Sequence, residues 1–222
     1  METIPLTDPR SEATRQRLID TGLTLFGRYG FDGVTTRQLA TTAQVNQAAI
    51  PYHFGGKEGV YLAIAEQIAA SVGPQVNALQ KNIHSRLNHE APQNLLLECT
   101  IKLAEIAFTP EHQSSWFIFL TREQFHPTAA LTILQRGFID PVHQLIGELI
   151  ALITNTAVDT EANILLTQAY LGPLVGFVCG KALLNKRLNW PIELTDLEWR
   201  QVIATVAHCS RATIAGLMLN AE

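Results

Sequence analysis

The sequence predicts an all-α protein with about nine helices. Along most of its 222 residues, apolar side chains recur at spacings of three and four, which places them on one face of a helix. No segment alternates apolar and polar residues as a half-buried strand does, and no repeat or low-complexity tract appears. A chain of this length can form one domain with a large core, or two smaller domains that share a helix.

The first predicted helix covers residues 12–29 and turns Leu18 and Phe26 toward a core. The segment before it, residues 1–11, is predicted to be a flexible arm. It lacks the basic-then-apolar order of a signal peptide, so we do not expect it to direct secretion.

Two short helices joined by a tight turn are predicted next, and they complete a first domain of residues 12–56. Thr36 is a good N-cap for a helix that carries Leu39 and Ala43 on one face. The turn is Gln44-Val45-Asn46, in which the valine is an apolar plug and the asparagine can cap the next helix. This helix-turn-helix arrangement places its second helix in the DNA major groove.

The second helix of the pair, residues 47–54, has the features of a DNA-reading helix. Ala48 and Ala49 are small, so the backbone N–H groups at its start can approach a phosphate. Ile50 and Phe54 are expected to hold the helix to the core. Gln47 and His53 are expected near base edges, and Thr36, Arg37, Tyr52 and Lys57 near phosphates. The residues predicted to contact DNA are Thr36, Arg37, Gln47, Ala48, Tyr52, His53 and Lys57.

A second domain is predicted for residues 57–222. It begins with a connecting helix, residues 57–86, that is interrupted at Gly73-Pro74. After a polar loop, a later helix is entered at Pro127, a favoured first-turn position, and is broken or kinked at Asp140-Pro141. The other helices predicted in this domain cover residues 92–108, 114–125, 160–187 and 195–220.

The last predicted helix is apolar on more than one side. It must therefore bury one face against its own core and another against something else. A two-fold dimer is the commonest solution, and it would present two reading helices to a palindromic operator. A wholly intramolecular core is the alternative. The residues predicted at the dimer interface are Trp199, Ile203, Val206, Ile214 and Leu217.

The densest mixture of aromatic and polar side chains lies between residues 116 and 129. Aromatic rings there can form an apolar pocket in which a charged or polar side chain orients a small molecule. The same aromatic residues can instead be ordinary core, with the charged ones in ion pairs. The residues predicted to line a ligand site are Trp116, Phe119, Arg122, Glu123, His126, Tyr170 and Phe177.

Charge and composition exclude several classes of protein. The net charge is −4, so there is no overall positive field. The segment from Arg10 to Glu58 nevertheless contains six basic and four acidic residues. Three widely spaced cysteines indicate neither a disulfide framework nor a zinc site, and they fit a reducing cytoplasm. The uncharged segment 164–180 is short for a bilayer and contains Gly172-Pro173, so a helix buried in a core and a dimer interface explains it better than a membrane span.

The sequence carries no catalytic motif. Its histidines lack metal-ligand spacing, and there is neither a glycine-rich phosphate loop nor a Gly-x-Ser-x-Gly turn. His208 and Cys209 are adjacent on a predicted helix and so point about 100° apart, which prevents them from pairing as base and nucleophile. We expect no enzymatic activity, no cofactor and no metal site.

Residues 34–61 resemble the DNA-binding signature of the tetracycline-repressor (TetR) family of bacterial regulators. The resemblance implies a DNA-reading N-terminal domain and a C-terminal helical domain. The latter binds a ligand and dimerises by pairing its last two helices with those of a second copy. The segment 18–31 is similar to the family's first helix and its exit. The matching residues are Thr35-Thr36, Leu39-Ala40, Ala43, Tyr52-His53-Phe54, Lys57-Glu58 and Tyr61.

Residues 122–128 are similar to an Arg-Glu-x-x-x-Pro-Thr element of a TetR subgroup that includes regulators of efflux-transporter genes and of antibiotic sensitivity. The resemblance implies a cytoplasmic homodimeric repressor, nucleoid-associated when bound to DNA. A small molecule would release it from the operators of transporter or detoxification genes. The alternatives are an activator of the same fold, or a helical interaction protein or enzyme with a vestigial helix-turn-helix.

Two positions depart from the family pattern. Gln44 stands where the turn usually has glycine, so a residue with a side chain must adopt the backbone shape of the turn. Pro51 lies inside the predicted reading helix, where it is expected to remove a backbone hydrogen bond and kink the helix.

Overall fold

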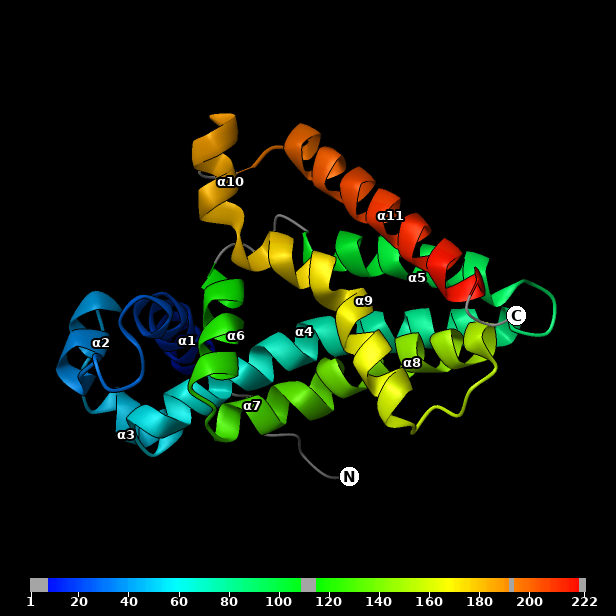
Figure 1. Ribbon diagram of the computed structural model, residues 1–222. Coiled ribbons are helices and arrows are strands. Elements are labelled where there is room, and N and C mark those ends of the chain that lie inside the picture. The colour runs from blue at the N-terminus through cyan, green and yellow to red at the C-terminus, as the bar shows by residue number, and fades with distance from the viewer. Residues whose placement is uncertain (1–7, 109–114, 192–193, 220–222) are drawn as a thin grey trace, which may run out of the picture. The chain divides into compact units, whose positions relative to one another are not determined.

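The computed structural model describes residues 8–108, 115–191 and 194–219. Every regular element within these ranges is helical, which confirms the predicted all-α fold. Figure 1 shows these helices in chain order.

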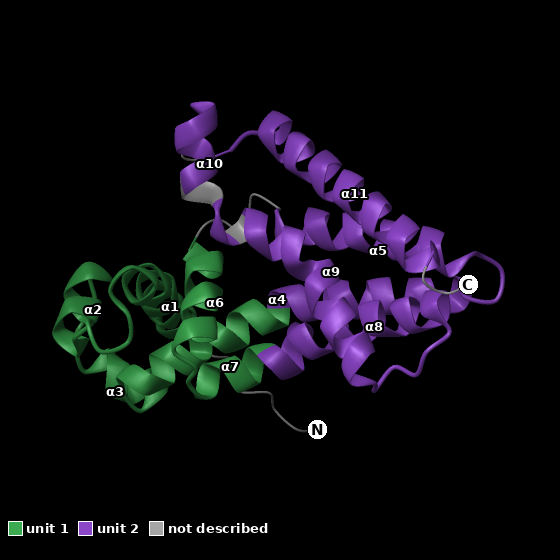
Figure 2. Cartoon of the chain, viewed as in Figure 1, with its two compact units in different colours: residues 1–70, 114–134 green, residues 71–113, 135–222 purple. Residues whose placement is uncertain are grey.

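The chain forms two compact units, coloured separately in Figure 2. Unit 1 contains residues 1–70 and 114–134, and unit 2 contains residues 71–113 and 135–222. The sequence predicted one division, after residue 56. The structure instead includes the start of the connecting helix and a segment from the middle of the chain in the N-terminal unit.

Unit 1 encloses a core of large side chains that are fully buried, among them Leu18, Phe26, Leu39, Ile50 and Phe119. Its helices are α1 (Pro9–Tyr29), α2 (Thr36–Thr42), α3 (Ala49–Phe54), the first part of α4 (Lys57–Arg86), α6 (Ser115–Phe125) and α7 (Ala129–Leu134).

Helix α1 begins earlier than the sequence predicted. The Asp8 carboxylate accepts a hydrogen bond from the Arg10 backbone N–H at 3.0 Å, and Pro9 occupies the first turn. Both features favour a helix start, because a first-turn proline loses no helical hydrogen bond. Residues 9–11 of the predicted arm are therefore helical, and residues 1–7 lie outside the described residues.

Helix α4 runs without interruption through Gly73-Pro74, where a break was predicted. The proline removes one backbone hydrogen bond, but Val76 and Ile83 beyond it are buried in the core of unit 2 and hold the helix in line. Gly73 has a packing role, because a Cβ placed there would lie 2.7 Å from the carbonyl oxygen of Gly137. The two backbones approach too closely for any side chain.

The helix predicted from Pro127 to Ile153, with a kink at Asp140-Pro141, is built differently. It consists of α7, a π-helical turn η2 (Gln135–Ile139) and α8 (Asp140–Thr154). Pro141 stands in the first turn of α8, where it breaks nothing. The irregular backbone therefore precedes Asp140, and Pro127 lies before the helix rather than in its first turn.

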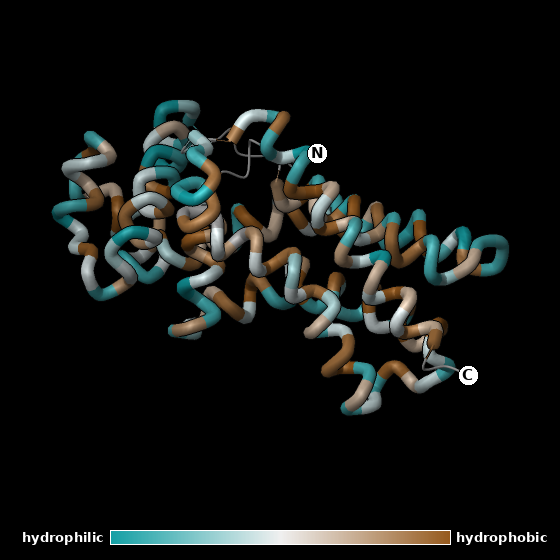
Figure 3. Tube along the Cα trace, turned by 45° about the horizontal axis from the view of Figure 1, so that its top comes forward, coloured by the Kyte–Doolittle hydropathy of each residue, from teal (hydrophilic) through white to brown (hydrophobic). Residues whose placement is uncertain are grey.

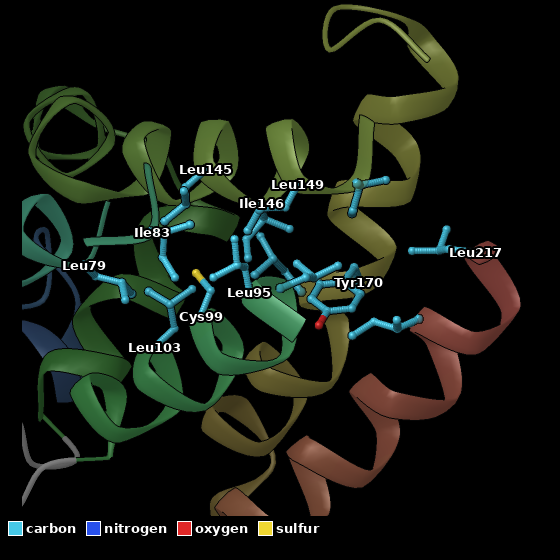
Figure 4. Packing of buried hydrophobic residues seen from close by; sticks show 14 of the residues in the cluster. Leu79, Ile83, Leu95, Cys99, Leu103, Leu145, Ile146, Leu149, Tyr170 and Leu217 are labelled. Carbon is cyan, nitrogen blue, oxygen red and sulfur yellow. The ribbon is translucent and has the colours of Figure 1, made fainter. Parts of the chain in front are cut away.

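Unit 2 contains two clusters of buried apolar side chains, and the second half of α4 contributes Val76, Leu79 and Ile83 to the larger one, shown in Figure 4. The predicted helix 160–187 is divided at Gly180 into two. The helices of unit 2 are α5 (Pro92–Ala107), α8, α9 (Glu161–Cys179), α10 (Lys181–Leu188) and α11 (Asp196–Leu219).

Among the described residues, α11 is the one helix long and apolar enough to span a bilayer by length and composition. It buries Val202, Val206 and Ile214 inside unit 2 and exposes Arg211 on the other side. In Figure 3, hydrophobic and hydrophilic residues are interleaved along the helical trace. A helix with one face in the protein core and a charge on the other has the pattern of a core helix.

Candidate nucleic-acid interface

The first helix of the predicted pair, α2, is capped by Thr35. Its hydroxyl oxygen accepts a hydrogen bond from the Gln38 backbone N–H at 3.1 Å. The predicted cap, Thr36, is instead the first helical residue. Leu39 and Ala43 are buried as predicted and fix the helix to the core of unit 1.

The turn after α2 depends on an unusual backbone conformation at Gln44. This residue has φ +55°, in the left-handed region that glycine adopts without strain. The structure therefore confirms that a residue with a side chain takes up the glycine-like shape.

We expect Gln44→Gly to raise the free energy of unfolding by about 1 kcal/mol, because the relief of left-handed strain exceeds the added chain entropy of the unfolded state. Urea unfolding at fixed protein concentration measures the change. The same exchange at Gln38, inside α2, should lower stability instead. A loss of stability in the Gln44 variant would show that the side chain itself holds the turn.

Helix α3 begins after an asparagine cap and is not kinked by its proline. The side-chain oxygen of Asn46 accepts a hydrogen bond from the Ala48 N–H at 2.9 Å. Pro51 lies in the first turn, where backbone N–H groups have no helical partner. The bonds around it are intact, since Tyr52 N–H donates to the Ala48 carbonyl and Gly55 N–H to that of Pro51. The predicted kink is therefore wrong.

One surface of the α2–α3 pair faces solvent and gathers most of the predicted DNA contacts. Tyr52 is 81% exposed, and its ring meets that of the half-buried His53 edge to face at 4.8 Å. Gln47 is exposed too, and its side-chain amide donates to the Thr36 hydroxyl at 3.1 Å, which ties the two helices together. Ala48 is exposed at the start of α3, and Arg37 is exposed on α2. Fully buried Ile50 anchors this surface from behind.

A second feature of unit 1 is a buried carboxylate between α4, α6 and α7. Glu123 has no exposed surface, and it accepts hydrogen bonds from the Tyr61 hydroxyl at 2.5 Å and from the backbone N–H of Thr128 at 3.0 Å. The Thr128 hydroxyl also bonds this carboxylate, and its oxygen caps α7 by accepting from Ala130 N–H. Burial, together with the hydrogen bond and negative charge of Glu123, raises the pKa of Tyr61, so the phenol remains a donor.

The comparison with known proteins agrees with this geometry. Residues 18–64 match the model of the family described as bacterial regulatory proteins, tetR family. Residues 92–217, more than half of the chain, match the C-terminal domain of the HTH-type transcriptional dual regulator CecR. The chain is a TetR-family transcriptional regulator. The family consists of DNA-binding regulators rather than enzymes.

Named relatives of this TetR-family chain include the HTH-type transcriptional dual regulator CecR of Shigella flexneri, which is 32% identical over 186 residues and 82% of each chain. The HTH-type transcriptional repressor AcnR of Corynebacterium diphtheriae is 29% identical over 128 residues, or 55% of this chain and 64% of that one. Both are described as transcriptional regulators.

Solved TetR-like structures share the fold at low sequence identity. The TetR-family regulator SCO4454 of Streptomyces coelicolor superposes with a TM-score of 0.62 at 16% identity and covers 96% of each chain. A regulator from Pseudomonas aeruginosa PAO1 gives the same TM-score and identity, covering 97% of this chain and 94% of that one. At this identity the likeness concerns the fold alone.

Lys57, in the TetR signature, directs its amine into the protein. The Nζ atom donates to the backbone carbonyls of Phe31 and Val34 at 2.9 and 3.0 Å, and it lies 4.2 Å from the centre of the Phe31 ring. These contacts hold the loop that leads into the Thr35 cap of α2. The structure therefore gives this lysine a role in supporting the DNA-facing surface.

We expect Lys57→Met to weaken operator binding while leaving the salt dependence of binding unchanged. The loop before α2 loses its two hydrogen bonds, but no phosphate loses a counter-charge. A lost phosphate contact instead lowers the slope of log K against log salt by about 0.9. Fluorescence anisotropy of a labelled duplex over a range of salt concentrations measures both. The control is Arg37→Met, which should reduce the slope, and an equal reduction for Lys57→Met would make it a direct phosphate contact.

The residues predicted to line a ligand site belong to different units of this TetR-family chain. Trp116, Phe119, Arg122, Glu123 and His126 are in unit 1, whereas Tyr170 and Phe177 are in unit 2. The unit 1 group serves packing in large part. The buried Phe119 ring packs against that of Tyr61 with 4.7 Å between ring centres, and Glu123 is hydrogen-bonded to Tyr61 and Thr128. His126 is exposed.

In unit 2, the predicted ligand residues lie in the core. The Tyr170 and Thr100 hydroxyls form a hydrogen bond of 2.7 Å, and both residues are buried. Phe177 is partly buried beside Phe108 and Val202. The two hydroxyls satisfy each other's hydrogen-bonding needs within an apolar core.

The residues predicted at the dimer interface face the protomer's own core. Val206, Ile214 and Leu217 are almost fully buried within the single chain. Ile203 and Trp199 are partly buried, and the Trp199 ring stacks on Phe108 at 4.8 Å between centres. Val206, Ile214 and Leu217 are therefore unavailable as the main contact with a second copy, whereas Trp199 and Ile203 keep part of their surface exposed. The apolar pattern correctly predicted this helix, but the residues taken from it lie mainly on the face that packs inside the protomer.

Sequence reasoning missed Tyr61 as a functional partner, although it recognised this residue in the family signature. Tyr61 lies 62 residues from Glu123 in the chain, and their hydrogen bond exists only in the fold. A local signal was available: a threonine before a helix is a typical N-cap. Thr128 precedes α7 and lies only five residues after Glu123.

Proposed function

We propose that this TetR-family regulator is a homodimeric repressor that reads a palindromic operator through α3 and releases it when a small molecule binds. The observation that carries the proposal is that Gln47, small Ala48 and Tyr52 are all exposed at the start and first turn of α3. A helix N-terminus without bulky side chains lets backbone N–H groups meet a phosphate. As in the sequence prediction, we place it in the cytoplasm as a regulator of transporter or detoxification genes.

The proposed contacts divide into base-reading and phosphate-binding groups. Gln47 and His53 are the candidates for base edges, because their amide and imidazole groups can donate and accept hydrogen bonds. Thr36, Arg37 and Tyr52 are the candidates for phosphates, which fix the register of the helix in the groove. Lys57 supports this surface from within, as its two backbone hydrogen bonds indicate.

We place the dimer interface on the exposed apolar faces of α9 and α11. On α9, Leu165 is 62% exposed and Val175 50% exposed, with Gly172 on the same helical face. On α11, Met218 is exposed while the opposite face is buried. An apolar face that the protomer leaves open is typical of a contact with another molecule, and a two-fold pair is the commonest such assembly.

The proposed effector site is in unit 2, near the buried Thr100–Tyr170 hydroxyl pair. Helix α4 is a direct route from there to the reading helices, because it begins with Lys57 in unit 1 and ends in the core of unit 2. A coupling of about 1–3 kcal/mol is the usual scale for such a switch, and the effector must bind one state more tightly than the other.

One observation favours a second candidate function. The Shigella flexneri relative is described as a dual regulator, which repressor activity alone does not cover. Activation at some promoters, with the same DNA contacts, is therefore the alternative. Transcription assays with the operator placed upstream of or over a promoter distinguish the two.

The test of the proposed function is selection of bound duplexes from a random library, followed by binding to the selected duplex at several salt concentrations. We expect a palindromic sequence, binding that weakens steeply with salt, and two protomers per duplex by sedimentation equilibrium. Binding that is equal for all sequences, or a single protomer on the duplex, would contradict it.

A further inference from the structure

The chain passes between its two units at three points. It crosses within α4 between residues 70 and 71, and at the start of η2 between residues 134 and 135. The third crossing, between residues 113 and 114, lies outside the described residues. Unit 1 is therefore joined to unit 2 by α4 and also by the segment that carries α6 and α7.

The backbone is irregular beside both described crossings. Pro74 interrupts the hydrogen bonding of α4, and the turn that follows α7 is π-helical. Near these irregularities the backbones of α4 and η2 are in contact. A side chain at Gly73 would collide with the carbonyl oxygen of Gly137. Each crossing taken alone is a place where a helix can bend.

We call α1 to α3 and the start of α4 the reading head. The α6–α7 segment is bonded to it by the cluster of Tyr61, Glu123 and Thr128, which we call the clasp. Its hydrogen bonds join α4, α6 and the cap of α7, and all three residues belong to unit 1. Two further contacts tie α6 to α1. Ile118 packs against Gly27, and the Arg122 guanidinium lies against the backbone at Gly30.

We propose that Glu123 is a positioning residue that sets the spacing between the two half-sites an operator must have. With the clasp closed, α4 and the chain crossing after α7 both act on one rigid reading head, so the head cannot turn about α4 alone. With the clasp open, α6 and α7 no longer restrain the head. Only the bending stiffness of α4 near Pro74 then limits its motion. The clasp therefore converts a flexible attachment into a fixed one. This inference rests on the proposed function as a dimeric operator reader.

The experiment compares Tyr61→Phe/Thr128→Val with the parent protein on duplexes of altered spacing. The variant removes both side-chain hydrogen bonds to Glu123 but keeps the Tyr61 ring on Phe119. The duplexes carry the selected palindrome with its half-sites at the original separation, one base pair closer or one base pair farther apart. A single half-site duplex completes the set. Hydrogen exchange at Leu131 reports whether the clasp is open, because its N–H donates to the Thr128 backbone carbonyl, which the variant keeps.

The parent should prefer its own spacing by at least about tenfold, because a one-base-pair change shifts and rotates one half-site relative to the other. In the variant this preference should fall below about threefold, while half-site affinity stays within about twofold of the parent's. Simple destabilisation lowers binding to all duplexes alike and leaves the preference unchanged. Thr132→Val, an exposed position on α7, should behave like the parent.

A variant that keeps the parent's spacing preference while α7 exchanges faster would overturn the inference. If the double variant does not fold, Tyr61→Phe alone is measured in the same way and judged by the same criterion. A parent protein without any spacing preference would instead contradict the dimeric function proposed above, so the two failures are distinguishable.

Discussion

Replacing Ala48 by aspartate is expected to reduce operator affinity at least about 100-fold while stabilising the protein, because the two effects of a carboxylate at this site have opposite signs. Ala48 is exposed in the first turn of α3, has a helical backbone conformation, and follows the Asn46 cap. Aspartate there places a carboxylate near the positive end of the helix dipole, which stabilises the helix by about 0.3–1 kcal/mol. Against DNA the same charge meets phosphates, and such like-charge contacts cost several kcal/mol.

Ala48→Ser is the matched control, since serine adds a small polar side chain without a charge and gains nothing from the helix dipole. We expect it to leave stability within about 0.5 kcal/mol of the parent and to keep operator affinity within about threefold. Anisotropy titrations and urea unfolding of the three proteins give both quantities. Undiminished binding by the aspartate variant would mean that the start of α3 does not approach the DNA backbone.

Replacing Glu123 by leucine is expected to lower the free energy of unfolding by about 3 kcal/mol, because it leaves the buried Tyr61 hydroxyl without its acceptor and removes the hydrogen bonds from Thr128 that join α6 to the start of α7. Leucine is close to glutamate in size, so loss of packing volume contributes little. Urea unfolding at fixed protein concentration measures the change, since the stability of a dimer depends on concentration.

Adding Tyr61→Phe to this variant should restore part of the loss, because the second exchange removes one orphaned donor. A double-mutant cycle gives the coupling between the two residues. The control is Glu105→Leu on the exposed face of α5, expected to change stability by less than about 0.5 kcal/mol. If the double variant lost the sum of the two single effects, the hydrogen bond would carry no shared energy.

Local sequence signals predicted the reading head well because short-range physics determines it. Buried Leu39 and Ile50 follow helical spacing, Asn46 caps the next helix, and Gln44 occupies a glycine-like position. The predicted kink at Pro51 was wrong for a related reason. The effect of proline depends on its turn within the helix, and α3 begins at Ala49, two residues later than predicted, so that Pro51 falls in the first turn.

The rest of the fold depends on contacts that the sequence does not display. A break at Gly73-Pro74 was a sound local expectation, yet the buried residues beyond it keep α4 straight enough to continue. In α11 the apolar pattern could not reveal which face meets the protomer's own core, and the predicted interface included Val206 and Leu217 from that core. The burial of Glu123 could not be predicted locally, because its partner Tyr61 is distant in the chain.

The discontinuous make-up of unit 1 decides how operator specificity can be exchanged between regulators of this kind. A chimera joined after residue 70 would combine a foreign α1 and α4 with the native α6, so that Tyr61 and Glu123 would come from different parents. The transplanted head would then lack its own carboxylate acceptor and its own ring partner at Phe119. Grafts that move residues 1–70 and 114–134 together keep these pairs intact, and they are the natural unit for building regulators with new DNA targets.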